Sequence, residues 1–187
     1  MRDLFFKKFL RLKKDDYLIL ADLHMSQEKI DNEESLIKQL RENSKTLILL
    51  GDTFQGDRVK AAVAHPDLYI EFINHNYIMV KGNNDIDCGL EGLLYEDKIL
   101  MHGHQLELSF LLFPKVYSFI AKILSFIKPE TYRGINKKRL PDRIIHILVR
   151  NSFIIGHFHK ELKIGKSCIL APRTLYLLKD NQISKIF

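Results

Sequence analysis

Cysteine is scarce in this chain, whose 187 residues include only Cys88 and Cys168. Two cysteines at this spacing make neither a disulfide framework nor the paired-cysteine motif of a metal site. Long uninterrupted apolar runs are missing as well. The most apolar segment, residues 110–127, is broken by Pro114 and two lysines, so we do not predict a membrane-spanning helix there. These absences favour a protein of the reducing cytoplasm.

The N-terminal segment, residues 1–16, lacks the continuous apolar core of a secretory signal, because basic residues interrupt its phenylalanines and leucines. This mixture is typical of a short basic amphipathic helix that contacts a membrane surface. It is equally typical of a helix or strand edge that packs on the domain. We therefore predict a cytoplasmic protein, with peripheral contact at the inner membrane surface as the alternative.

Internal repeats and low-complexity tracts are also absent, so we expect one domain over residues 1–187. Hydrophobic residues make up 46% of the chain and charged residues 28%, which is typical of a globular protein. The net charge of +6 favours an anionic partner, namely a phosphorylated compound, a nucleic acid or a membrane surface. A surplus of lysine on an ordinary soluble surface explains the charge equally well.

Five short apolar runs, each typical of a buried strand, end in residues whose side chains can bind metal ions. In chain order, the runs and the residues that follow them are 17–21 with Asp22 and His24, 46–50 with Asp52, 77–80 with Asn83, Asn84 and Asp85, 98–101 with His102 and His104, and 152–155 with His157 and His159. Because open α/β sheets bind ligands at the carboxyl ends of their strands, we expect these side chains to meet.

The segments between the first three runs have helical patterns. A helix over 33–41, capped by Asp31 or Asn32, is followed by a helical stretch after Asp57 and a helix from Pro66. This β-α-β-α-β order predicts a parallel sheet. The remaining predicted strands are one near 93–95 and two C-terminal hairpins, 162–164 with 168–170 and 174–178 with 183–187.

The ordered motifs Asp-x-His, Gly-Asp, Gly-Asn-x-Asp, His-Gly-His and Gly-His-x-His resemble the blocks of the calcineurin-like metallophosphoesterases. The resemblance extends from Asp22 to His159, most of the chain. It implies an α/β fold, the four-layer αββα metallophosphoesterase β-sandwich, in which the two C-terminal hairpins would belong to the second sheet. Three other histidines match no block and are expected to have ordinary structural roles: His65, His75 and His146.

The resemblance also implies two divalent metal ions, with Mn first and Fe, Zn, Ni or Co as alternatives. One ion would be held by Asp22, His24, Asp52 and His159. The other would be held by Asp52, Asn83, His102 and His157, so that Asp52 bridges the pair. Such a pair lowers the pKa of a bridging water, and the resulting hydroxide attacks phosphorus in line while both ions neutralise the developing charge.

Asn84 departs from the family pattern, because many members have a histidine at this position that acts on the transition state or the leaving group. An asparagine can donate a hydrogen bond to phosphate but cannot deliver a proton. Asp85 is expected to orient Asn84 or its loop, and His104 could act as a replacement acid. The Gly-Asn-Asn-Asp block and the His-Gly-His block are similar to those of small prokaryotic phosphodiesterases, which favours phosphodiesters or phosphoanhydrides over monoesters.

Residues 105–150 separate the last two histidine blocks, and we predict a helical insertion there, with helices over 110–127 and 141–150. The insertion is apolar first and basic afterwards. Its placement and character are similar to those of the UDP-2,3-diacylglucosamine pyrophosphatases, which cut a lipid-linked pyrophosphate at the membrane surface. It would serve as a lid, as a homodimer interface or as a membrane contact.

The sequence thus predicts a dinuclear metal-dependent phosphoesterase that hydrolyses phosphodiester or pyrophosphate bonds in a phosphorylated small molecule or a lipid-linked substrate. Three alternatives remain: a membrane-surface pyrophosphatase, a nuclease whose basic insertion follows the nucleic acid backbone, and a non-catalytic scaffold with this fold. The nuclease ranks lower because few aromatic residues accompany the basic cluster over residues 137–139.

Overall fold

Strand β2 (Tyr17–Leu20) lies at the centre of a five-stranded sheet. It pairs in parallel with β3 (Thr46–Leu50), which pairs in parallel with β4 (Ile78–Val80). On the other side of β2, β10 (Leu175–Lys179) pairs antiparallel and connects to β11 (Gln182–Lys185) at the edge.

The structure, a computed structural model, describes residues 9–85, 89–106, 140 and 142–186. The parallel pairing of β2, β3 and β4 confirms the sheet predicted for this part of the chain.

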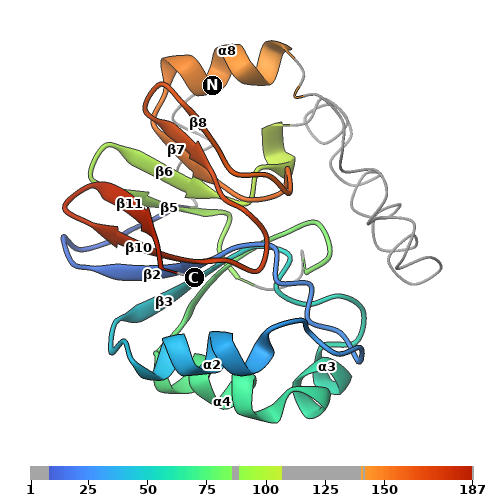
Figure 1. The fold of residues 1–187 in the computed structure, drawn as a ribbon. Coiled ribbons are helices and arrows are strands. Elements are labelled where there is room, and N and C mark those ends of the chain that lie inside the picture. The colour runs from blue at the N-terminus through green and yellow to red at the C-terminus, as the bar shows by residue number, and fades with distance from the viewer. Residues whose placement is uncertain (1–8, 86–88, 107–139, 141, 187) are drawn as a thin grey trace.

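A second, six-stranded sheet stacks on the first (Figure 1). Its strands, in spatial order, are β1 (Phe9–Arg11), β5 (Gly92–Tyr95), β6 (Lys98–Met101), β7 (Phe153–Ile155), β9 (Ser167–Ile169) and β8 (Leu162–Ile164). Strands β6 and β7 run parallel, so their carboxyl ends lie side by side. Two of the five predicted strand ends therefore belong to this sheet rather than to the sheet of β2.

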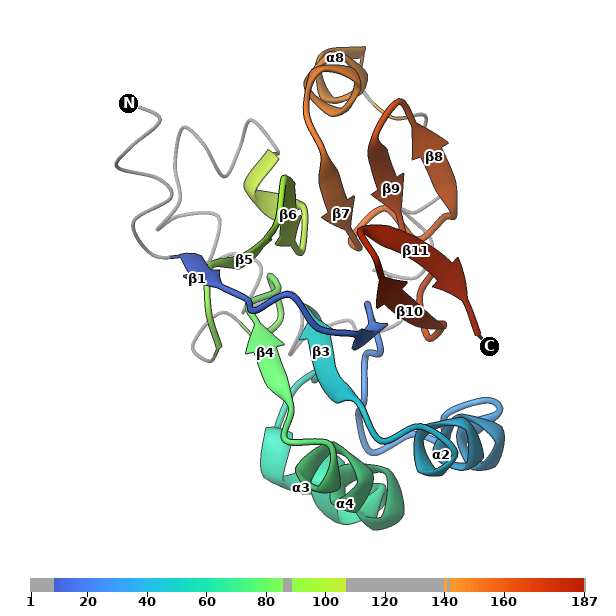
Figure 2. The same cartoon turned by 90° about the vertical axis from the view of Figure 1, so that its left-hand side faces the viewer.

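Helices cover the outer faces of both sheets, as the two views show (Figures 1 and 2). Helices α2 (Glu33–Arg41), α3 (Arg58–Ala64) and α4 (Pro66–Asn74) pack on the sheet of β2. Helix α8 (Asp142–Arg150) packs on the other sheet through Ile144 and Leu148. The order helix, sheet, sheet, helix confirms the predicted α/β four-layer sandwich.

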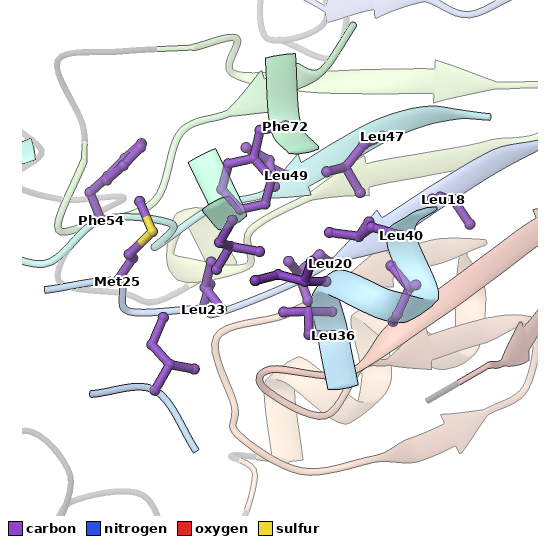
Figure 3. Packing of buried hydrophobic residues seen from close by; sticks show 14 of the residues in the cluster. Leu18, Leu20, Leu23, Met25, Leu36, Leu40, Leu47, Leu49, Phe54 and Phe72 are labelled. Atoms are coloured by element: carbon purple, nitrogen blue, oxygen red, sulfur yellow. The ribbon is translucent and has the colours of Figure 1, made fainter. Parts of the chain in front are cut away.

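The central strands are buried on both faces, and their side chains alternate between two cores with the period of two that a strand imposes. In β2, Leu18 and Leu20 face the helices, whereas Ile19 lies between the sheets. Figure 3 shows the helix-side core, in which leucines of β2 and β3 meet Leu36 and Leu40 of α2. Each fully buried side chain of this size contributes about 1.5–3 kcal/mol of transfer free energy, so these strands anchor the loops that follow them.

Helix α2 has the predicted bounds and a buried face of Leu36, Ile37 and Leu40. Asn32 occupies the N-cap position, but its side chain makes no capping hydrogen bond. Its backbone is left-handed, with φ of 61°, whereas a capping side chain normally projects from an extended residue. The predicted side-chain cap is therefore wrong at Asn32.

The two C-terminal hairpins are present but lie in different sheets, so the prediction that both belong to the second sheet is wrong. Strands β8 and β9 do join that sheet, and β8, whose first two residues are exposed, forms its edge. Strand β10 pairs with β2 instead. Leu175 packs among the helices while Tyr176 and Leu178 pack between the sheets, and a strand that is apolar on both faces needs a central position.

The N-terminal expectations are partly tested. Residues 1–8 lie outside the described part, and Phe9–Arg11 forms the edge strand β1 rather than a helix, paired in parallel with β5. This corresponds to the strand edge packed on the domain. In the predicted insertion, the helix expected over 141–150 is observed as α8, whereas the helix over 110–127 lies outside the described residues. No helix in the described ranges is long and apolar enough to cross a membrane.

Candidate metal centre

The loops after β2, β3, β4, β6 and β7 converge, and they bring together side chains from all five predicted blocks. Two overlapping groups result, each with ligand atoms within 4.8 Å of one another. We call Asp22, His24 and His159 the open group, because both histidines are only half-buried. We call Asp22, Asp52 and His102 the buried group, since all three are buried. Asp22 belongs to both groups, whereas the sequence prediction made Asp52 the shared ligand.

The buried group concentrates negative charge around one imidazole. His102 Nε2 donates to Asp22 Oδ1 at 2.9 Å and lies 3.7 Å from Asp52 Oδ2. Burial by itself would lower the pKa of His102, but the Asp52 and Asp22 carboxylates raise it to about 9. Burial would likewise raise the pKa of Asp22, yet the hydrogen bond and charge of His102 hold it below its ordinary value. Two buried carboxylates of this kind need a cation beside them, and a divalent ion meets that need.

The open group presents two imidazoles to each other. The Nε2 atoms of His24 and His159 lie 3.2 Å apart, and the ring centroids are 5.1 Å apart. Burial lowers the pKa of both histidines, although the nearby carboxylates of Asp22 and Asp52 oppose the shift. Neutral imidazole is the form that binds metal ions, so the open group is ready for ligation near neutral pH.

Asn83 provides an independent test of whether a metal ion fits. Its side chain is buried, and neither its amide oxygen nor its amide nitrogen has a hydrogen-bond partner among the described residues. Leaving a buried polar group without a partner costs about 1–3 kcal/mol, so such a group needs an explanation. Asn83 directly precedes Asn84, which bonds Asp52, and an amide oxygen is a suitable ligand for a divalent ion. The donor set therefore fits the implied metal ions.

Backbone strain accumulates at the same positions. Five predicted ligands have left-handed backbone conformations, with φ between 46° and 65°: Asp22, His24, Asp52, His157 and His159. Residues other than glycine adopt this region at a cost, and such outliers cluster at functional sites.

Two glycines allow the loops to approach closely. A Cβ at Gly82 would collide with the backbone nitrogen and carboxylate of Asp52, and a Cβ at Gly156 would collide with the Asp22 carboxylate. These contacts explain why a glycine is required immediately before Asn83 and immediately before His157.

His157 lies beside the buried group. Its backbone nitrogen donates to Asp22 Oδ2 at 2.6 Å, and its ring packs edge-on against the His102 ring with centroids 4.7 Å apart. Among the described residues, it belongs to neither group of ligand atoms within 4.8 Å of one another. Its role as a metal ligand therefore stays a prediction that rests on the motif.

Asn84 and Asp85 lie against Asp52. The backbone and side-chain nitrogens of Asn84 donate to the two carboxylate oxygens of Asp52. Asp85 is buried and accepts hydrogen bonds from backbone nitrogens of the same loops. Burial and the charge of Asp52 raise the pKa of Asp85 to about 6.

His104 is fully buried in the short 3₁₀ helix η1 (His104–Leu106), where its Nδ1 lies 2.9 Å from Nδ1 of His102. Burial lowers the pKa of His104 well below its ordinary value, and the neighbouring His102 and His157 add to the shift. A neutral, buried imidazole is a poor proton donor, so this environment does not favour the replacement acid that the sequence suggested.

The histidines that match no motif block have ordinary structural surroundings. His65 bonds Glu33 and the backbone of Glu28, and His75 bonds two backbone carbonyls, those of Lys45 and Leu40. His146 is exposed on α8.

Arg173 is a residue near the site that sequence reasoning missed. Its backbone nitrogen bonds the carbonyl oxygen of Ala21, and its Nε donates to the carbonyl oxygen of Leu23 at 3.2 Å. Its positive charge adds to the burial that lowers the pKa of His24. The sequence signal was a single basic residue between two predicted strands. The backbone groups that it bonds lie about 150 residues earlier, and only the pairing of β10 with β2 brings them close.

The comparison with protein families agrees with the motif pattern. The calcineurin-like phosphoesterase family matches residues 16–187. Among solved structures, the chain is similar to a conserved uncharacterized protein, a predicted phosphoesterase from Streptococcus pneumoniae TIGR4. The two are 15% identical over 90% of this chain and 86% of that chain, with a TM-score of 0.39. The search of curated proteins gave no match.

Proposed function

Because the chain belongs to the calcineurin-like phosphoesterase family, we propose that it is a dinuclear metal-dependent phosphoesterase that hydrolyses phosphodiester or pyrophosphate bonds. One observation carries this proposal: the two carboxylates and the imidazole of the buried group lie within 4.8 Å of one another, beside the half-buried histidines of the open group. The buried Asn83 amide, which has no partner among the described residues, supports the same conclusion.

Seven residues would hold the two ions: Asp22, His24, Asp52, Asn83, His102, His157 and His159. When bound, divalent ions supply a water nucleophile at neutral pH and neutralise charge on the phosphate oxygens. The residues of the chain prepare this chemistry. Asp22 and Asp52 provide the negative charge that attracts the cations, and the half-buried rings of His24 and His159 form the side of the site that substrate and solvent can reach.

Three residues near the centre bear on the choice of substrate: Arg173, Asn84 and His104. Arg173 places a guanidinium next to the open group, where it would attract an anionic phosphate. Asn84 cannot transfer a proton, and His104 is buried against His102. Because neither residue is suited to protonate a leaving group, the site favours substrates whose leaving group departs without a proton. Such substrates are phosphoanhydrides and diesters with acidic leaving groups rather than alkyl monoesters.

The experiment compares Mn-dependent hydrolysis of bis(para-nitrophenyl) phosphate and para-nitrophenyl phosphate, with Asp52→Asn as the variant. We expect diester hydrolysis that requires Mn and that is lost in the variant. Folding of Asp52→Asn is checked by its melting temperature without metal. Full activity and full metal content in Asp52→Asn would contradict the mechanism.

Each alternative function is tested by an additional assay on the same protein. A lipid-linked pyrophosphate presented in vesicles tests the membrane-surface enzyme, and salt-dependent binding of an oligonucleotide tests the nuclease. A protein that binds no metal at saturating Mn would be a scaffold. Analytical ultracentrifugation tests whether the protein forms a homodimer through the insertion. Vesicle flotation tests peripheral membrane contact.

A further inference from the structure

We propose that Asn84 and Asp85 are positioning residues that together fix Asp52, and that neither side chain contacts the substrate. The inference rests on the proposed metal-dependent function, because its consequence is the affinity of the centre for metal. It replaces the sequence prediction, in which Asn84 donates to phosphate and stands in for the histidine of other family members.

Asn84 holds both oxygens of the Asp52 carboxylate. Its backbone nitrogen donates to Oδ1 at 2.9 Å, and its side-chain Nδ2 donates to Oδ2 at 2.7 Å. Two donors from one residue, one on each oxygen, restrict rotation of the carboxylate about its last side-chain bond. A carboxylate that must present oxygens to a metal ion binds better when its orientation is set in advance.

Asp85 holds the backbone that carries Asp52. Its Oδ2 accepts from the backbone nitrogen of Thr53 at 2.7 Å, and its Oδ1 accepts from those of Gly82 at 2.6 Å and Asp52 at 3.2 Å. The loop after β3 and the loop after β4 are thus joined through one buried carboxylate. This bond set also offsets the cost of the left-handed conformation of Asp52, whose φ is 46°.

The two neighbours therefore act on different parts of Asp52. Asn84 donates to its side chain, and Asp85 accepts from its backbone. A residue that contacts the reacting phosphate would direct its polar atoms away from the ligands and toward the substrate. The Asn84 amide instead places Nδ2 within hydrogen-bond distance of a predicted metal ligand, which is the arrangement of an outer residue that orients a ligand.

The test measures metal affinity and catalysis separately in Asn84→Ala. The matched control is Asn43→Ala, which removes a side-chain hydrogen bond to a backbone carbonyl at the end of α2. Mn affinity is measured by equilibrium titration. We expect Asn84→Ala to bind Mn about 10–100-fold more weakly than wild type, as is typical for loss of a residue that orients a ligand. Asn43→Ala is expected to bind Mn like wild type.

The second readout is the dependence of kcat/KM on the leaving group, measured with a series of aryl phosphodiesters at saturating Mn. If Asn84 only orients Asp52, Asn84→Ala keeps the slope of wild type. Unchanged Mn affinity combined with a steeper leaving-group dependence would overturn the proposal, because it would place Asn84 on the substrate. Failure of wild type to bind Mn would instead contradict the proposed function, so the two failures are distinguishable.

A second variant keeps the test decisive if Asn84→Ala does not fold. Asp85→Asn preserves shape but places an amide nitrogen or a neutral oxygen against the backbone donors of Gly82 and Thr53. We expect it to weaken Mn binding by a similar factor. Its control is Asp57→Asn, since the Asp57 carboxylate also accepts two backbone hydrogen bonds, at the start of α3. Equal loss of Mn affinity in Asp85→Asn and Asp57→Asn would overturn the positioning role.

Discussion

The open group and the buried group share Asp22 but differ in every other physical respect. The open group adds two half-buried imidazoles to Asp22, and Arg173, from the loop before β10, donates to the backbone beside it. The buried group is fully enclosed, carries two carboxylates around one imidazole and is oriented by Asn84 and Asp85. We propose on this basis that the buried group sets the geometry of the centre and that the open group contacts the substrate.

Removing the shared residue should have the largest effect, because Asp22 is the only side chain that contributes to both groups as the described residues define them. Asp22→Asn keeps the shape but removes a negative charge from each group. We expect Mn-dependent diester hydrolysis to fall by more than about 100-fold, beyond the loss typical of changing an outer residue. Activity and bound Mn are measured together, and retention of both would show that the groups do not depend on their common member.

Stability should separate the two groups next. His102→Ala leaves Asp22 and Asp52 buried without a cation, which should destabilise the metal-free protein by about 3–5 kcal/mol. His159→Ala, at a half-buried position, should cost less than about 1 kcal/mol, as most partly exposed substitutions do. Urea denaturation in EDTA measures both. Equal losses would contradict the assignment of a structural role to the buried group alone.

The pH dependence of stability should have opposite signs in the two groups. The carboxylates raise the pKa of His102 to about 9, so its contribution is complete below its ordinary value near 6.5 and is lost as the pH rises toward 9. Burial lowers the pKa values of His24 and His159, so their contributions are complete above 6.5 and are lost on acidification.

Urea denaturation of the metal-free protein over about four pH units around the ordinary histidine value, from about pH 5 to about pH 9, measures these contributions. His102→Gln should remove the loss on the alkaline side, and His159→Gln should reduce the loss on the acid side. Identical profiles for the two variants would contradict the difference in charge between the groups.

The smallest effect is expected at Arg173, which neighbours the open group without belonging to it. Arg173→Ala removes a guanidinium whose hydrogen bonds to an anionic substrate would contribute about 1.5 kcal/mol, so kcat/KM should fall about tenfold. Mn affinity should change little. The matched control is Arg41→Ala, which removes an arginine paired with Glu71 far from the site, between α2 and α4. A similar decrease in both variants would argue against substrate contact.

The order of the blocks allowed much of this architecture to be predicted. Apolar runs ending in Asp, Asn or His identify buried strands whose carboxyl ends meet. The helix over 33–41 and the helix that starts at Pro66 follow from ordinary periodicity. Which sheet each strand joins was harder to predict from the sequence. The apolar character of 174–178 showed that it is a strand, but only its packing on both faces requires the place beside β2.

The candidate site divides in the same way. The sequence identified which residues gather, but spacing along the chain could not reveal that Asp22 lies in both groups or that the Asn84 amide bonds Asp52. Side-chain direction depends on left-handed turns at Asp22 and Asp52, which residue type alone does not predict. Arg173 was missed because its neighbours come from a strand at the other end of the chain.

The most direct test of a dinuclear centre is the number of Mn ions bound per chain, measured by equilibrium dialysis and elemental analysis of the wild-type protein. We expect two ions per chain in wild type and loss of tight binding in Asp22→Asn. One ion, or none, in folded wild-type protein would contradict it, because the open group and the buried group would then not form a pair of metal sites.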